Sequence, residues 1–234
     1  MPTNNSPQQA QMITGENRIQ SVSRRKFLVF AGASASIVAM AASCKKDHDN
    51  NMDTGVDLGK DDIGILNYAY ALEQLEAAFY TQVILTPYSG ISDGEKALLT
   101  DIRDHEIAHR EFFKTALGGS AIPGLEVDFK TVDFTKRDSV LATAKTFEDL
   151  GVSAYNGAGK LIKMADYLVL AGKIVSVEAR HAAYIRDLIS NGSFADTTVI
   201  DAMGLDKAMM PMDVLAAAAP FIKTKINASN LPTS

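Results

Sequence analysis

One stretch of the sequence decides the fold: residues 147–155 read FEDLGVSAY, which places Glu148 seven residues before Tyr155. Glu73 stands at the same distance before Tyr80, earlier in the chain. Seven residues span about two turns of an α-helix, so each glutamate lies on the same helical face as its tyrosine. The repeat therefore predicts two similar helices, each of which presents a carboxylate and a phenol on one side.

A second spacing alternates with the first. Residues 177–183 read VEARHAA, in which Glu178 stands three residues before His181, and Glu106 stands three residues before His109. Side chains three residues apart are neighbours on one face of a helix. The order along the chain is thus Glu-Tyr, Glu-His, Glu-Tyr, Glu-His, which predicts two similar helix pairs.

Apolar residues recur at helical spacing through four segments. These segments cover residues 61–84, 93–117, 136–164 and 166–189. The second and third are separated by residues 118–135, a connection too long for a simple hairpin loop. The sequence therefore predicts an all-α fold, an antiparallel four-helix bundle with one long crossover between helices two and three.

Polar residues predict where several helices begin. Asp61 and Asp62 are expected to cap the first helix, because acidic side chains are favourable at a helix N-terminus. Ser92 and Glu95 have the spacing of a capping box at the start of the second helix. In the C-terminal region, Asp213 is expected to cap a short helix.

The composition excludes several functions. The chain has 234 residues, which suits one domain of about 150 residues with appendages. A net charge of −5 argues against nucleic acid as a partner, because nucleic acid binds basic surfaces. Aromatic residues make up only 7% of the chain and tryptophan is absent, which argues against an aromatic sugar-binding platform.

The N-terminal residues are typical of an export signal. Arg24 and Arg25 precede a Phe-Leu pair and a short apolar stretch, as in twin-arginine signals. That stretch ends in Ala-Ala-Ser before Cys44, which resembles the cleavage site of bacterial lipoproteins. We therefore expect an exported protein of the cell envelope, anchored in the periplasm or outer membrane by a lipid on Cys44.

The predicted domain organisation has four parts. They are a signal segment at residues 1–44, a flexible tether at 45–60, the helical bundle at 61–190, and an extension packed on the bundle at 191–234.

The charge pattern predicts a metal centre. Each of the four repeated glutamates stands among apolar residues, where a carboxylate is costly unless it binds a positive group. Four carboxylates in one core would also repel one another strongly. Two divalent cations balance these four charges, and two imidazoles complete the ligand set. The predicted ligands are Glu73, Glu106, His109, Glu148, Glu178 and His181.

Other polar residues near these ligands have open roles. Tyr80 and Tyr155 are candidate catalytic residues beside the ligands, as hydrogen-bond donors or electron sources, or else they only pack in the core. Glu76 could be a ligand or a neighbour of the site. His105 is about 100° off the face of Glu106, so we expect it to lie behind the ligands or to be exposed, and to matter little.

The four-helix ligand pattern resembles that of the ferritin-like superfamily, over about residues 60–190. Residues 147–152 and 177–183 resemble one branch in particular, the exported bacterial ferritin-like proteins related to plant desiccation-related proteins. The resemblance implies ligand roles for the same six residues. It implies a site more directly than a substrate.

Three functions are compatible with this pattern. The first is redox chemistry at two iron or manganese ions, with peroxide, dioxygen or ferrous iron as the small-molecule partner. The second is a non-enzymatic envelope protein of stress or desiccation, in which the metal is structural. The third, an iron-storage cage, fits less well with a lipid tether and a long C-terminal extension. The sequence leaves open whether the chain forms a homo-oligomer.

Overall fold

The structure is a computed structural model that describes residues 55–234. The predicted export signal with Arg24 and Arg25, the lipidation site Cys44 and most of the predicted tether lie outside these residues. Within residues 55–234, no helix combines the length and the apolar character that a membrane span requires.

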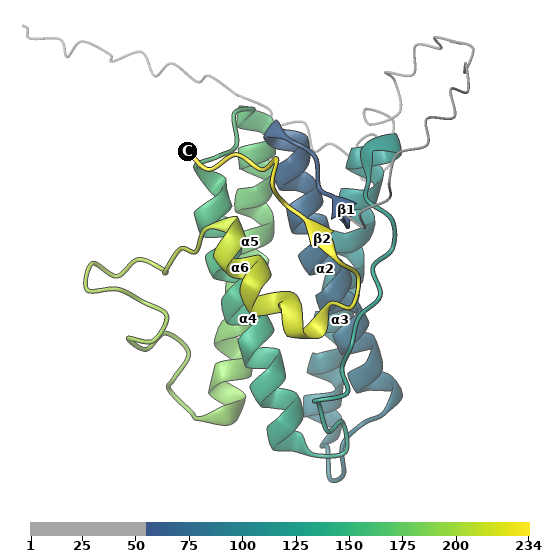
Figure 1. Ribbon diagram of the computed structural model, residues 1–234. Helices are drawn as coiled ribbons and strands as arrows, with labels where there is room; N and C mark the ends of the chain where they lie inside the picture. Colours follow the sequence, from purple (N-terminus) through teal and green to yellow (C-terminus); the bar gives the residue numbers. More distant parts are fainter. Residues whose placement is uncertain (1–54) are drawn as a thin grey trace, which may run out of the picture. The chain divides into compact units, whose positions relative to one another are not determined.

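The described chain forms an all-α bundle, as predicted (Figure 1). Its four long helices are α2 (Asp61–Leu85), α3 (Asp93–Leu117), α4 (Arg137–Gly159) and α5 (Ala165–Ile189). Helices α2 and α3 form one antiparallel pair, and α4 and α5 form the other. The connection between the two pairs begins with a short 3-10 helix, η1 (Gly118–Ser120). It then runs along the bundle as the predicted crossover.

Helix α2 is the most buried of the four long helices. It is buried around most of its circumference, as expected for a helix that is apolar on all sides. Two amides on α2 bind the backbone of the crossover. Asn67 accepts from the backbone N–H of Ile122 at 3.0 Å, and Gln74 accepts from that of Leu125 at 2.8 Å. These bonds satisfy backbone groups that would otherwise be buried without a partner.

The predicted helix starts are partly confirmed. The Ser92 side chain accepts a hydrogen bond from the backbone N–H of Glu95 at 3.2 Å, as in a capping box. The prediction that Asp61 and Asp62 cap α2 is wrong, because Lys60 is the N-cap residue and no side chain caps this helix. Both acids do lie in the first turn, near the positive end of the helix, as expected.

Asp62 instead organises the turn before α5. Its carboxylate accepts from the backbone N–H groups of Lys163 and Met164, each at 2.8 Å. Met164 is the N-cap residue of α5, so a side chain from α2 satisfies one of the free backbone donors at this helix start. Helix α4, the third of the predicted helices, ends at Gly159, five residues before its predicted end at Met164.

The C-terminal residues pack on α4. Helix α6 (Pro211–Ala218) begins at a proline, so the expected cap Asp213 lies inside its first turn. The backbone N–H of Met209 donates to the carbonyl of Ser153 at 2.9 Å. Gly157 makes this approach possible, because a Cβ atom there would lie 1.8 Å from the carbonyl oxygen of Met209.

Two short segments close the described chain. Helix α6 leads into the 3-10 helix η2 (Ala219–Phe221), and strand β2 (Ile226–Asn227) then pairs in parallel with β1 (Val56–Asp57). The C-terminal extension therefore packs on α4 and pairs with the first residues of the described chain.

Candidate metal centre

The six predicted ligands meet in the middle of the bundle, and each helix contributes to the set. The four glutamates are 0% exposed and His181 is 4% exposed, so the cluster lies in the core. The cluster comprises Glu73 from α2, Glu106 and His109 from α3, Glu148 from α4, and Glu178 and His181 from α5.

The ring of His109 faces three of the carboxylates. Its Nδ1 atom lies 2.8 Å from Glu178 Oε1, 3.4 Å from Glu73 Oε2 and 3.7 Å from Glu106 Oε2. These residues offer ligand atoms that all lie within 4.8 Å of one another. They form one group of four donors that could hold a metal ion.

The ring of His181 repeats this arrangement. Its Nδ1 atom lies 2.8 Å from Glu106 Oε1, 3.5 Å from Glu148 Oε2 and 3.7 Å from Glu178 Oε2. Glu106 and Glu178 belong to both groups and turn a different oxygen toward each histidine. The geometry therefore gives two adjacent groups of candidate donors that share two carboxylates.

The donor atoms fit metal ions because they lack other partners. Within the described residues, the donor atoms that point into the cluster are buried and make no hydrogen bond of good geometry, although several lie close together. These atoms are Nδ1 of both histidines, Oε2 of Glu73 and Glu148, and both carboxylate oxygens of Glu106 and Glu178. Two ligands at right angles on one ion, each about 2.1 Å from it, lie about 3 Å apart. The observed separations of 2.8–3.7 Å agree with that spacing.

Without metal, the cluster holds protons. Burial raises the pKa of Glu73 and Glu106, and the charge of Glu178 adds to the effect. Burial also raises the pKa of Glu148, to about 7. Burial acts on Glu178 in the same direction, but the close contacts with His109 and His181 outweigh it and lower the pKa of Glu178.

The two histidines respond to the surrounding carboxylates. Burial alone would lower the pKa of an imidazole. The carboxylates around His109 and His181 outweigh burial and raise the pKa of each to about 12. Metal ions at the two positions would therefore displace protons from the cluster.

Both predicted tyrosines reach the cluster, and each binds the glutamate of the opposite helix. The Tyr80 hydroxyl of α2 donates to Glu148 Oε1 at 2.5 Å. The Tyr155 hydroxyl of α4 donates to Glu73 Oε1. Each hydrogen bond occupies the outer carboxylate oxygen and leaves the inner oxygen facing a histidine.

His105 contacts the cluster from behind His181, which is one of the two placements predicted for it. Its Nδ1 atom lies 2.9 Å from Nε2 of His181, the ring nitrogen that faces away from the carboxylates. The ring planes differ by 8° and the ring centres are 5.1 Å apart, so the rings meet edge to edge. A neighbour of this kind fixes the orientation and tautomer of a metal-binding histidine. His105 is four residues before His109, a spacing that puts both on one helical face and could have pointed to this role.

Glu76 is a fifth buried carboxyl group beside the cluster. It is 4% exposed, and burial followed by the charge of Glu106 raises its pKa well above the ordinary value. It belongs to neither group of four donors. Gly151 leaves the space for it, because a Cβ atom there would lie 3.1 Å from Glu76 Oε1.

Glu76 and His105 have no counterpart in the second half of the internal repeat. Position 151 in α4 corresponds to position 76 in α2, because each stands three residues after the repeated glutamate of its helix, Glu148 or Glu73. Position 177 in α5 corresponds to position 105 in α3 in the same way, and it is a valine. The two groups of candidate donors are therefore similar in composition and differ in their surroundings.

A family model described as "Ferritin-like domain" matches residues 61–191, more than half of the chain. The chain belongs to the ferritin-like domain family. No curated protein matches it. The ferritin-like domain contains all six clustered residues and both tyrosines, whereas α6 and β2 lie beyond it.

Proposed function

We propose that this ferritin-like protein binds two iron or manganese ions and carries out redox chemistry on peroxide, dioxygen or ferrous iron. One observation carries the proposal: the two groups of donors share Glu106 and Glu178. Shared carboxylates would hold two ions close enough to act on one small molecule. Two such ions supply Lewis acidity and electrons to an oxygen substrate when they are bound.

The protein residues contribute position and electrostatics. The four carboxylates would balance the charge of two divalent ions and, with the two imidazoles, would hold them. Tyr80 and Tyr155 fix the outer oxygens of Glu148 and Glu73. The surrounding core excludes bulk water, which strengthens each electrostatic interaction. Oxygen and imidazole donors suit iron and manganese, and they also accept zinc, so metal analysis is part of the test.

The test begins with protein recovered from its native export route. We expect two bound ions per chain and consumption of at least one of the three substrates. Glu148→Gln and His181→Ala should each reduce the metal content and abolish turnover. Glu111→Gln provides a matched control, since Glu111 lies on the solvent-facing side of α3 and its side chain is 50% exposed.

One outcome would replace the redox proposal with the alternative. A protein that binds two ions and is silent toward peroxide, dioxygen and ferrous iron is not an oxidoreductase of this class. The metal would then stabilise the bundle, as proposed for a non-enzymatic envelope protein related to the desiccation-related branch.

We further propose that the protein is exported and lipid-anchored through Cys44. The support is the Arg24-Arg25 signal that ends at this cysteine. Changing both arginines to lysine should retain the precursor inside the cell, and Cys44→Ala should release the exported protein from the membrane. Unaffected export of the lysine variant, or unchanged membrane association of the alanine variant, would contradict the respective part.

A further inference from the structure

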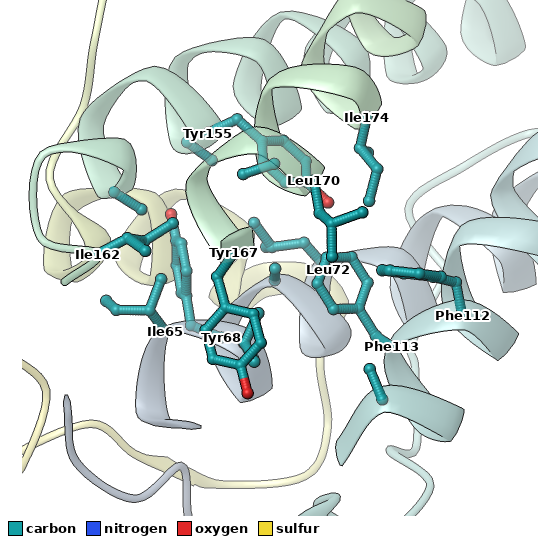
Figure 2. Close-up of a pocket in the computed structure, with 16 residues that line it drawn as sticks. Ile65, Tyr68, Leu72, Phe112, Phe113, Tyr155, Ile162, Tyr167, Leu170 and Ile174 are labelled. Carbon is teal, nitrogen blue, oxygen red and sulfur yellow. The ribbon is translucent and has the colours of Figure 1, made fainter. Parts of the chain in front are cut away.

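A groove lies beside α4 and α5, outside the core of the bundle. Its free volume is about 680 Å³, whereas the apolar space inside the bundle measures only about 40 Å³ (Figure 2). The third wall of the groove belongs to the segment of residues 190–209, here called the arm, which stands away from the bundle between α5 and α6 in Figure 1. Most of the lining residues are apolar, and α5 contributes the small side chains of Ala179, Ala182 and Ala183. The groove therefore has room for apolar side chains from another molecule.

The arm ends in an ordered turn that exposes large apolar side chains. Ile200 and Asp206 form an antiparallel bridge that closes this turn. Inside it, Asp201 Oδ1 accepts from the backbone N–H groups of Met203 and Leu205, at 2.8 and 2.9 Å. Met203 is 78% exposed and Leu205 is 58% exposed. Exposed apolar side chains on a turn that its own hydrogen bonds hold in shape indicate a contact surface.

The apolar surface of the protein is concentrated on the elements that form the groove. Of the eleven large apolar side chains that are exposed within residues 55–234, seven belong to α5 or the arm. These seven are Leu168, Val169, Tyr184, Ile189, Phe194, Met203 and Leu205. The uncovered apolar surface is thus not spread evenly over the bundle.

The tip of the arm does not fill the groove of its own chain. Ile200 and Asp206 line the groove, so the tip begins where this wall ends. The base of the arm is fixed by Arg186 of α5, which binds Asp149 of α4 at 2.6 Å and Asp196 of the arm at 2.7 Å. Because the base is fixed, the arm holds the groove open and carries the tip beyond it.

The groove and the tip also carry opposite charges. Lys145 of α4 lines the groove and forms no salt bridge within residues 55–234, while Arg186 binds the nearby carboxylate of Asp149. At the tip, Asp201 uses only Oδ1 for its own turn. An acid on the tip and an unpaired lysine in the groove make the two surfaces complementary in charge as well as in shape.

We propose that two copies of this chain form a two-fold dimer in which the arm tip of each copy enters the groove of the other. A two-fold axis uses the same pair of surfaces twice, so the tip and the groove are covered in both copies. Met203 and Leu205 fill the groove, and Asp201 faces Lys145 of the second copy. The family match ends at residue 191, so the tip belongs to a segment beyond the ferritin-like domain.

Sedimentation equilibrium tests the dimer. The full chain with Cys44→Ala, which removes the lone cysteine and the proposed lipid, should sediment with twice the mass of one chain. A charged tip (Met203→Asp with Leu205→Asp) and a blocked groove (Ala183→Arg) should each give a monomer. Leu85→Asp is the matched control and should stay dimeric, since Leu85 is 73% exposed and lies at the end of α2.

A mixture of the two monomeric variants separates docking from misfolding. The tip variant keeps an intact groove and the groove variant keeps an intact tip, so the mixture should form a heterodimer through one remaining contact. In the otherwise unmodified dimer, Lys145→Glu should raise the dissociation constant several fold. Lys114→Glu, which makes the same change on an exposed part of α3, should leave it unchanged.

Single cysteines locate the contact, and their small size decides the matter if Ala183→Arg does not fold. In the Cys44→Ala background, a chain with Met203→Cys and a chain with Ala183→Cys should form a mixed disulfide on mild oxidation, because a disulfide requires Cα atoms within about 7 Å. A monomer at every concentration, no mixed disulfide, or disulfides only between two Met203→Cys chains would overturn the proposal. An amphiphile or a different protein found in the groove in place of the second copy would overturn it as well.

Discussion

The hydroxyl of Tyr80 lies 2.5 Å from Oε1 of Glu148 and donates a hydrogen bond across the bundle. Tyr155 returns the same contact from α4 to Glu73 on α2. The two helices are antiparallel, so the tyrosine that is two turns beyond one glutamate arrives beside the glutamate of the other helix. Tyr80, from the first half of the repeat, therefore supports the donor group that contains Glu148 and His181. Tyr155, from the second half, supports the group that contains Glu73 and His109.

This exchange predicts separable effects of two conservative variants. Tyr80→Phe removes the donor to Glu148 and should weaken the ion beside His181, while Tyr155→Phe should weaken the ion beside His109. Loss of a hydrogen bond behind a ligand typically reduces metal affinity by about 10–100-fold. Stepwise manganese titration would show one weakened site in each variant. Equal weakening of both sites in both variants would contradict this assignment.

The sequence predicted which residues cluster at this centre but not the partners of the tyrosines. Helical periodicity defines which residues share a face, and it correctly grouped Glu73 with Tyr80. It does not define which helix that face meets, because this depends on the packing of segments far apart in the chain. Asp62 failed as a prediction for the same reason, since the free N–H groups that it binds belong to a turn about 100 residues later.

His105 offers a prediction that differs from the one made from sequence. Its contact with Nε2 of His181 should fix that imidazole for metal binding through Nδ1. His105→Leu should therefore lower affinity at the ion beside His181 by about 10-fold or more, and His105→Asn should recover part of it. The measurement is the same manganese titration.

Val177 supplies the control for His105, because it occupies the corresponding place in the repeat and cannot accept a hydrogen bond. Val177→Ala should leave the affinity beside His109 nearly unchanged. If His105→Leu has two tight sites like the unmodified protein, the contact has no role in metal binding.

Gly151 and Glu76 form a pair that a double-mutant cycle can examine. An alanine in a helix is ordinarily more stable than glycine by about 0.5–1 kcal/mol. At position 151, the added Cβ would lie 3.1 Å from Glu76 Oε1, so Gly151→Ala alone should destabilise the fold or displace the carboxyl group. In a Glu76→Ala background the same change should be stabilising. Denaturant unfolding of the four proteins gives the coupling, and purely additive effects would rule out the contact.

The last prediction concerns pH and follows from the protons held without metal. The pKa values of His109 and His181 are raised to about 12, so their contribution to stability is complete below pH 6.5 and declines above it. The pKa of Glu148 is raised to about 7, and its contribution declines from about pH 4.5 upward. The lowered pKa of Glu178 acts with the opposite sign, but only as the pH falls below about 4.5.

Metal-free protein should therefore lose stability as the pH rises from 6 to 9, by up to about 1.4 kcal/mol per pH unit for each proton held by the cluster. Manganese competes with these protons, so its stabilising effect should grow over the same range. Thermal unfolding at pH 6, 7.5 and 9, with and without manganese, measures both trends. Metal-free protein that gained stability toward pH 9 would show that the histidines do not hold protons among these carboxylates, and the electrostatic account of the cluster would fail.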